Sequence, residues 1–163
     1  MINKHKQKGA ETVEFAMIAV LFFAVLFVII ECGRALFVWN ALAEATRRGA
    51  RMAVVCPYPS PIPAQVAIFD VIGGALGTSP IINGLTPAMV SVRYLNPAGA
   101  VEANPMLIEF VEVSITDYTY TLIIPLWGSS FTAPAFTTTL STESLGAVPT
   151  YPGGALIAPD CNF

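Results

Sequence analysis

The stretch KGAETVEFAMIAVLFFAVLFVII, residues 8–30, decides the fold of this chain. Its sixteen residues from Phe15 to Ile30 carry no charge, and Glu14 stands directly before them. An uncharged apolar run of this length predicts a helix that partitions into lipid. A carboxylate drawn to mid-bilayer costs about 2.5–3.5 kcal/mol, so the glutamate at the threshold needs an explanation.

The helical pattern continues well beyond the apolar run. No proline occurs from Ala10 to Val55, and glycine appears there only at Gly33 and Gly49, which predicts one long helix or two helices nearly end to end. At 1.5 Å per residue, about 45 residues span roughly 68 Å, about twice the thickness of a bilayer core. We therefore expect residues 10–33 to cross a membrane and residues 34–55 to continue outside it.

The second part of this helix is amphipathic. Apolar and small residues recur there at spacings of three and four, and the predicted buried stripe is Leu36, Trp39, Ala43, Thr46, Ala50 and Ala53. Arg47, Arg48 and Arg51 lie off this stripe and are expected to face solvent. The helix should lay its apolar stripe on the rest of the chain.

Residues 56–163 are predicted to form a small exported α+β domain. The run CPYPSPIP, residues 56–63, holds four prolines and should end the long helix. A short helix over residues 64–76 is expected next, and then strands over 88–96, 107–122 and 136–145. The alternation of the second strand changes phase near Asp117, which predicts a bulge or a bend. The fold class is α+β, a long N-terminal helix packed on a small antiparallel sheet.

Composition and charge argue against nucleic-acid binding and favour one orientation in a membrane. The 163 residues are 55% hydrophobic and 12% charged, with a mean hydropathy of +0.65, which is apolar for a soluble domain. The net charge is +3 through Arg51 and −6 beyond it, so the distal part has no basic surface for nucleic acid. Lys4, Lys6 and Lys8 precede the apolar run, which favours a cytoplasmic N-terminus and an exported domain.

No constellation of catalytic residues is apparent. The one histidine, His5, lies on the cytoplasmic side, and no pair of cysteines has metal-ligand spacing. Glu109 and Glu112 would point to opposite faces of a regular strand, and the glycines of residues 73–77 lack the lysine of a phosphate loop. We expect no catalytic residue, cofactor, metal ion or small-molecule substrate.

Two cysteines flank the distal domain. In an oxidising exported compartment Cys56 and Cys161 either form a disulfide or remain two unpaired thiols. A disulfide would close a loop of about 105 residues, for which the chain-entropy account gives roughly 4–5 kcal/mol of stabilisation.

The segment KGAETVEF, residues 8–15, resembles the processing site of type IV prepilins, particularly those of the tight-adherence (Tad) system. That site is a basic leader ending in glycine, a cut after it, glutamate as the fifth residue of the mature chain and an aromatic residue next. The matching residues are Gly9, Ala10, Glu14 and Phe15. Residues 29–53 are similar to TadE-like pseudopilins, with E-x-G-R at Glu31 to Arg34, then N-A-L and R-x-G-A-R.

This resemblance implies a pilin-like fold and a minor pseudopilin of the Tad adhesive pilus. Residues 1–9 would be a leader that a prepilin peptidase removes at the bacterial inner membrane, and the partners would be that membrane, the peptidase and other pilin or pseudopilin subunits. The main pilins of this system are very short, so 163 residues argue against the bulk fibre subunit.

The resemblance also suggests a purpose for Glu14. A cut after Gly9 would create an amine on Ala10, and in an assembled pilus the Glu14 carboxylate of one copy would meet the amine of its neighbour. Alternatively, Glu14 stabilises the helix start through the helix dipole, and both roles can coexist. Glu31 and Arg34, three residues apart, are expected to form a structural salt bridge near the outer interface, with partner recognition as the alternative.

Two other classes of protein fit the same pattern. One is an uncleaved single-pass envelope protein whose exported sheet domain binds a surface partner. The other is a secreted protein with a signal peptide cut near residues 41–45. The N-terminal residue of the mature protein distinguishes the three.

Overall fold

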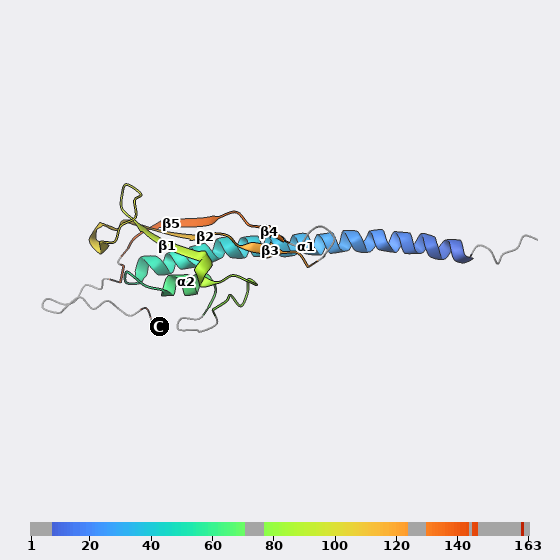
Figure 1. Cartoon of the computed structure of the whole chain (residues 1–163), viewed down its shortest axis with the longest axis horizontal. Helices are drawn as coiled ribbons and strands as arrows, with labels where there is room; N and C mark the ends of the chain where they lie inside the picture. Colours follow the sequence, from blue (N-terminus) through green and yellow to red (C-terminus); the bar gives the residue numbers. More distant parts are fainter. Residues whose placement is uncertain (1–7, 71–76, 124–129, 144, 147–160, 162–163) are drawn as a thin grey trace, which may run out of the picture.

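The computed structural model describes residues 8–70, apart from the side chain of Lys8, and residues 77–123, 130–143, 145–146 and 161. Helices and strands follow in the order α1 (Lys8–Val55), α2 (Ile62–Ala67), η2 (Pro87–Met89), β1 (Val90–Leu95), η3 (Pro105–Leu107), β2 (Phe110–Ile115), β3 (Thr119–Thr121), β4 (Ser130–Thr132) and β5 (Phe136–Ser141). The architecture is α+β, as predicted: a long helix and a small antiparallel sheet (Figure 1).

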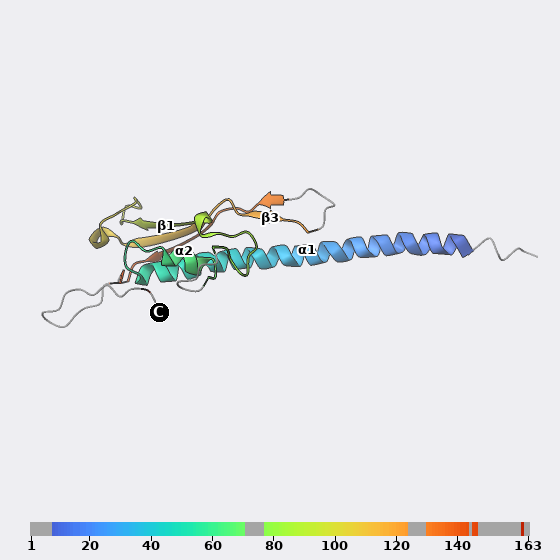
Figure 2. The same ribbon diagram turned by 60° about the horizontal axis from the view of Figure 1, so that its bottom comes forward.

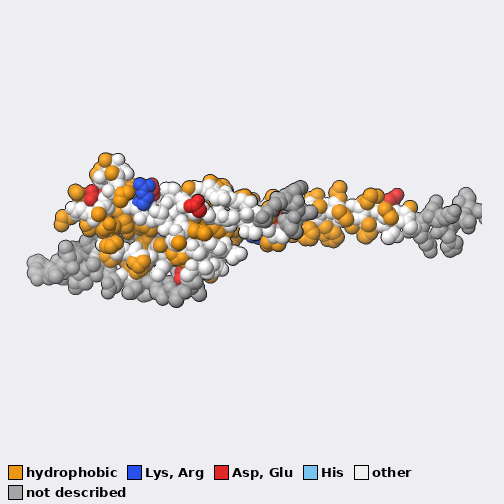
Figure 3. Space-filling model, in the orientation of Figure 1, with side chains coloured by type: hydrophobic (Ala, Val, Ile, Leu, Met, Phe, Trp, Pro, Cys, Tyr) orange, Lys and Arg blue, Asp and Glu red, His pale blue; other side chains and the backbone are white. Residues whose placement is uncertain are grey.

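The N-terminal helix α1 is a single unbroken element of 48 residues. Its second half carries the folded domain, and its first half projects from that domain as a rod (Figures 1 and 2). By length and composition α1 is able to cross a membrane, and its most apolar part is buried by nothing in the chain. Figure 3 shows hydrophobic side chains along this rod with few charged ones among them. Such a surface requires a cover from outside the chain.

The proline-rich stretch ends α1, as predicted, and leads into α2. This second helix is shorter than the expected 64–76: it begins at Ile62, ends at Ala67, and is followed by Phe69 with a φ of 64°. A left-handed residue this close stops helical hydrogen bonding, and the sequence pattern does not reveal it. Residues 71–76 of the prediction lie outside the described part.

Three strands form the main sheet in the order β1-β2-β5, all antiparallel. In the register, Val113 of β2 lies opposite Val92 and Thr138. The inward-facing side chains of β2 are fully buried, and they are Val111, Val113 and Ile115. The alternation predicted for this strand is therefore confirmed.

The expected strand over 107–122 is divided in two. Asp117 adopts a φ of 60°, between the end of β2 at Ile115 and the start of β3 at Thr119. The predicted bend is confirmed, and after it both Tyr118, which directly precedes β3, and Tyr120 within β3 are buried. That strand pairs with β4, which the sequence pattern does not predict because its three exposed residues show no alternation of apolar and polar side chains.

The buried face of α1 differs from the predicted stripe. Thr46, Ala50 and Ala53 are buried as expected, and Ala43 is half-buried. Leu36 and Trp39 are exposed, by 65% and 46%, whereas Leu42, one row away, is 1% exposed. Two adjacent rows of this helix are apolar, so periodicity alone does not choose between them. The buried face takes residues from both rows, and its small residues, such as Ala45 and Gly49, let the helix approach the sheet and α2 closely. Outside that face, the guanidinium side chains expected to face solvent are exposed: Arg47, Arg48 and Arg51.

Candidate functional site

The residues of the processing-like motif lie in the first turns of α1. Gly9, Ala10, Glu14 and Phe15 are all exposed. A side chain added at Gly9 would meet nothing within 4 Å, so no other described part of the chain packs against this position. The first N–H groups of a helix also lack an intrahelical acceptor, which makes this turn easy to open.

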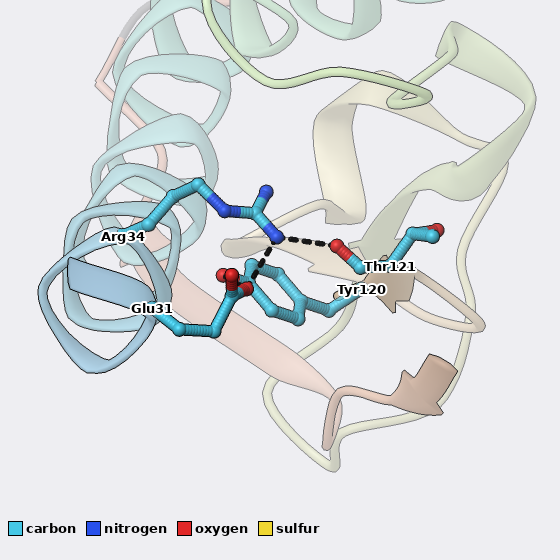
Figure 4. Close-up of polar contacts among 4 residues, drawn as sticks. All are labelled: Glu31, Arg34, Tyr120 and Thr121. Atoms are coloured by element: carbon cyan, nitrogen blue, oxygen red, sulfur yellow. Dashed lines mark hydrogen bonds and ion pairs between the residues drawn. The ribbon is translucent and has the colours of Figure 1, made fainter. Parts of the chain in front are cut away.

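A polar cluster occupies the place where α1 meets the antiparallel β3–β4 hairpin, which here means residues 119–123 and 130–132 (Figure 4). Arg34 Nη2 donates to Glu31 Oε1 at 2.6 Å and also to the backbone oxygen of Thr121. The hydroxyl of Tyr120 donates to the same Glu31 Oε1 at 2.8 Å. The Arg34 guanidinium lies over the Tyr120 ring, with Cζ 4.3 Å from its centroid. One ion pair on the helix thus binds both the side chain and the backbone of β3.

The sequence predicted only two of the four residues in this cluster. The i,i+3 spacing pointed to Glu31 and Arg34, but Tyr120 and Thr121 are 87–89 residues away along the chain. The available signal was the change of phase at Asp117, after which the tyrosines share one face. It marked Tyr120 as inward-facing without telling which part of the helix it would reach.

The environment of the cluster is partly desolvated. Burial, and then the hydrogen bond to Glu31, raise the pKa of Tyr120 to about 12, so this hydroxyl keeps its proton at neutral pH. The Glu31 side chain is 12% exposed, and its charge is balanced by Arg34. A neutral, hydrogen-bonded pair is tolerated close to lipid far better than a lone charge.

Two carboxylates bracket the uncharged run, and their surroundings differ. Glu14 and Glu31 are seventeen residues apart, about 25 Å along the helix axis and slightly less than the roughly 30 Å of a hydrocarbon core. Glu31 has a cation, a hydroxyl and the hairpin around it. Glu14 is exposed, and among the described residues no cation lies within ion-pair distance of it.

The structure joins the two cysteines that flank the distal domain. Cys56 and Cys161 form a disulfide with their Cα atoms 5.7 Å apart, and both are buried. The bond ties the C-terminal end of the described chain to the end of α1.

The described residues contain no group of three His, Cys, Asp or Glu side chains that could hold a metal ion. Glu112 is paired with Arg93 on the neighbouring strand at 2.9 Å, while Glu109 lies before β2 and is exposed. His5 and residues 73–76 lie outside the described part. The polar contacts described above, those of Glu31 and of Glu112, hold secondary-structure elements to one another.

Comparison with known proteins gives one match. Residues 9–51, about a quarter of the chain, match the model of the TadE-like protein family. The match runs along α1 from the processing-like glycine through Glu31 and Arg34 to Arg51, so the resemblance of this helix to TadE-like proteins is confirmed. Neither the curated proteins nor the solved structures contain a match.

Proposed function

We propose that this chain, with its TadE-like helix, is a minor pseudopilin of a Tad-type adhesive pilus. In this proposal a prepilin peptidase cuts the membrane-anchored precursor after Gly9, and the product acts in pilus assembly or as a minor subunit. The observation that carries the proposal is the family match over a helix whose apolar half the chain leaves uncovered. Lipid covers that half before assembly, and the helices of other subunits cover it afterwards.

The proposed topology places the N-terminus in the cytoplasm and the sheet domain outside the bacterial inner membrane. Three leader lysines beside the apolar run favour this orientation. A disulfide between Cys56 and Cys161 fits an oxidising compartment on the side of the domain.

Glu14 is the proposed assembly residue, together with Phe15 next to it. Cleavage would remove Lys4, Lys6 and Lys8 and leave a positive amine on Ala10. The Glu14 carboxylate is exposed and has no cation near it among the described residues. Because water is scarce between packed helices, an ion pair with the Ala10 amine of an adjacent copy would stabilise this carboxylate strongly. The pair would set the register of one helix against the next.

The signal-peptide alternative fits the geometry poorly. A cut near residues 41–45 would remove Val38 and Leu42 from the hydrophobic core and would detach the Glu31 carboxylate from Tyr120. The uncleaved anchor is the second candidate, because the buried core that α1 shares with the sheet begins at Val38, far from Gly9, and is the same with or without the leader.

The first test is N-terminal sequencing of the full-length gene product extracted from membranes of cells that contain the matching peptidase. A mature chain beginning at Ala10 supports the pseudopilin. An intact Met1 supports the uncleaved anchor, and a start near Glu44 or Thr46 supports the signal peptide.

A second test separates assembly from simple helix capping. Glu14→Ala should leave membrane insertion intact and abolish piliation, counted on whole cells by electron microscopy. Glu11→Ala, which removes the other exposed carboxylate of the helix start, is the matched control and should leave piliation normal. If the two variants behave alike, the role of Glu14 is that of a helix cap.

A further inference from the structure

We infer that the β3–β4 hairpin is a second membrane-contacting element, whose exposed apolar side chains lie in the lipid headgroup layer on the side of the folded domain. The inference rests on the proposed membrane anchoring by α1. It adds a second point of attachment, so that α1 and the domain packed on it would not rotate freely in the membrane.

The level of the hairpin along α1 is the first argument. If the midpoint of the uncharged run, between Phe22 and Phe23, sits at mid-bilayer, the hydrocarbon core reaches about ten residues in each direction and the headgroup layer about four residues further. Glu31 and Arg34 therefore fall at the edge of the core and within the headgroup layer. The hairpin is hydrogen-bonded to these same two residues, so it lies at the same level.

The position of the hairpin in the domain agrees with this. In Figures 1 and 2 it occupies the end of the domain nearest the apolar half of α1, while the gold turn of η3 lies at the opposite end. A domain anchored by α1 would present the hairpin to the membrane and η3 to the aqueous phase.

The surface chemistry of the hairpin is the second argument. Strands β3 and β4 read Thr-Tyr-Thr and Ser-Phe-Thr and contain no charged residue. Ile123, just beyond β3, is 72% exposed, and Phe131 of β4 is 46% exposed while its ring lies 4.9 Å from that of Tyr120. On α1 at the same level, Leu36 and Phe37 are exposed as well. These exposed apolar side chains lie at the level where the lipid-facing part of the helix ends, and aromatic rings of this kind are favoured at membrane interfaces.

The charges at this level would not oppose contact with lipid. Among the described residues beside Tyr120 and Thr121 they are Glu31 and Arg34, which neutralise one another, while the exposed Asp117 precedes β3 at its other end, towards β2. The Thr121 carbonyl accepts a hydrogen bond from Arg34, so the guanidinium links the hairpin to the helix. Because this hydrogen bond holds β3 against α1, the strand can lie in the headgroup layer and keep its position on the helix.

The test uses the full chain in phosphatidylethanolamine–phosphatidylglycerol vesicles. A nitrobenzoxadiazole probe is attached to single cysteines at three exposed positions, Ile123→Cys, Met106→Cys and Ala24→Cys, in a Cys32→Ser background without reducing agent. Met106, 93% exposed on η3, is the matched control for an apolar side chain at the opposite end of the domain. Ala24, within the uncharged run, reports whether α1 has inserted.

The measurement is quenching by lipids that carry a nitroxide in the headgroup. We expect the probe at Ile123 to be quenched at least threefold more than the probe at Met106, with a blue-shifted emission. Equal quenching at the two positions, with the Ala24 probe blue-shifted in the bilayer, would overturn the hairpin inference and leave the anchoring intact. A water-exposed Ala24 probe would overturn the anchoring and the hairpin inference together.

Discussion

Replacing Gly49 by alanine should destabilise the domain, although alanine is the better helix former. Gly49 lies on the face of α1 that meets α2 and β2. A Cβ built there would stand 2.9 Å from Ala67 Cβ, 3.2 Å from the Pro63 backbone oxygen and 3.2 Å from Val113 Cγ1. The nearest neighbours are a methyl group fixed to a helix and a backbone carbonyl, so neither can turn aside.

Two opposing terms set the magnitude. Removing glycine from a helix interior stabilises by about 1 kcal/mol, while overpacking a tight contact costs about 1–3 kcal/mol. The matched control is Gly33→Ala in the same helix, where an added Cβ meets nothing within 4 Å. Subtracting the control cancels the helix-propensity term. The difference between the variants should therefore be about 1–3 kcal/mol, with Gly49→Ala the less stable.

The assay is thermal unfolding of the full chain in detergent micelles, followed by near-ultraviolet circular dichroism, which reports the packing of the domain. For a chain of this size each kcal/mol corresponds to about 2–4 °C in Tm. Equal midpoints for the two variants would refute the reasoning, because they would show that α1 and α2 do not approach each other closely at Gly49.

Three further predictions concern the pH dependence, the disulfide and the buried face of α1. Because the pKa of Tyr120 is raised from 10.0 to about 12, its stabilising effect is complete below pH 10 and is lost as the pH rises towards 12. Tyr120→Phe should therefore flatten the fall of Tm across that window. Reducing the Cys56–Cys161 disulfide should lower the free energy of unfolding by up to about 4–5 kcal/mol, measured by urea titration with and without dithiothreitol. In the same titration Leu42→Ala should cost about 2–5 kcal/mol and the control Leu36→Ala under about 0.5 kcal/mol. A larger cost for Leu36→Ala than for Leu42→Ala would instead support the stripe expected from the sequence.

Much of the fold could be predicted from local signals. The absence of proline over more than forty residues predicted α1, and the four prolines after it predicted its end. The alternation of β2 and its change of phase at Asp117 predicted both the strand and the bend. These features depend on residues adjacent in the chain, which is why periodicity found them.

The errors arose where the answer depends on contacts between distant segments. The face of α1 that meets the sheet is selected by the fit of Gly49 against Ala67 and Val113, and the hydrophobic pattern of the helix alone does not contain that fit. The short strand β4 exists because β3 is there to pair with it. The attachment of Tyr120 to Glu31 likewise needs the bend, the hairpin and the helix to be in place first.

The two carboxylates that bracket the uncharged run look alike in the sequence, and the structure separates them. Glu31 is neutralised within its own chain, because Arg34 follows one turn later and Tyr120 returns from the hairpin. An additional cation brought to Glu31 would compete with Arg34, so subunit contact there has little to gain. Glu14 has no such cation among the described residues, and a positive group supplied by another molecule would meet an unbalanced charge. If helices associate through the apolar half of α1, the electrostatic preference for register must therefore come from the N-terminal end of the run. The Glu31 cluster would act within each subunit, where it holds the domain to its helix.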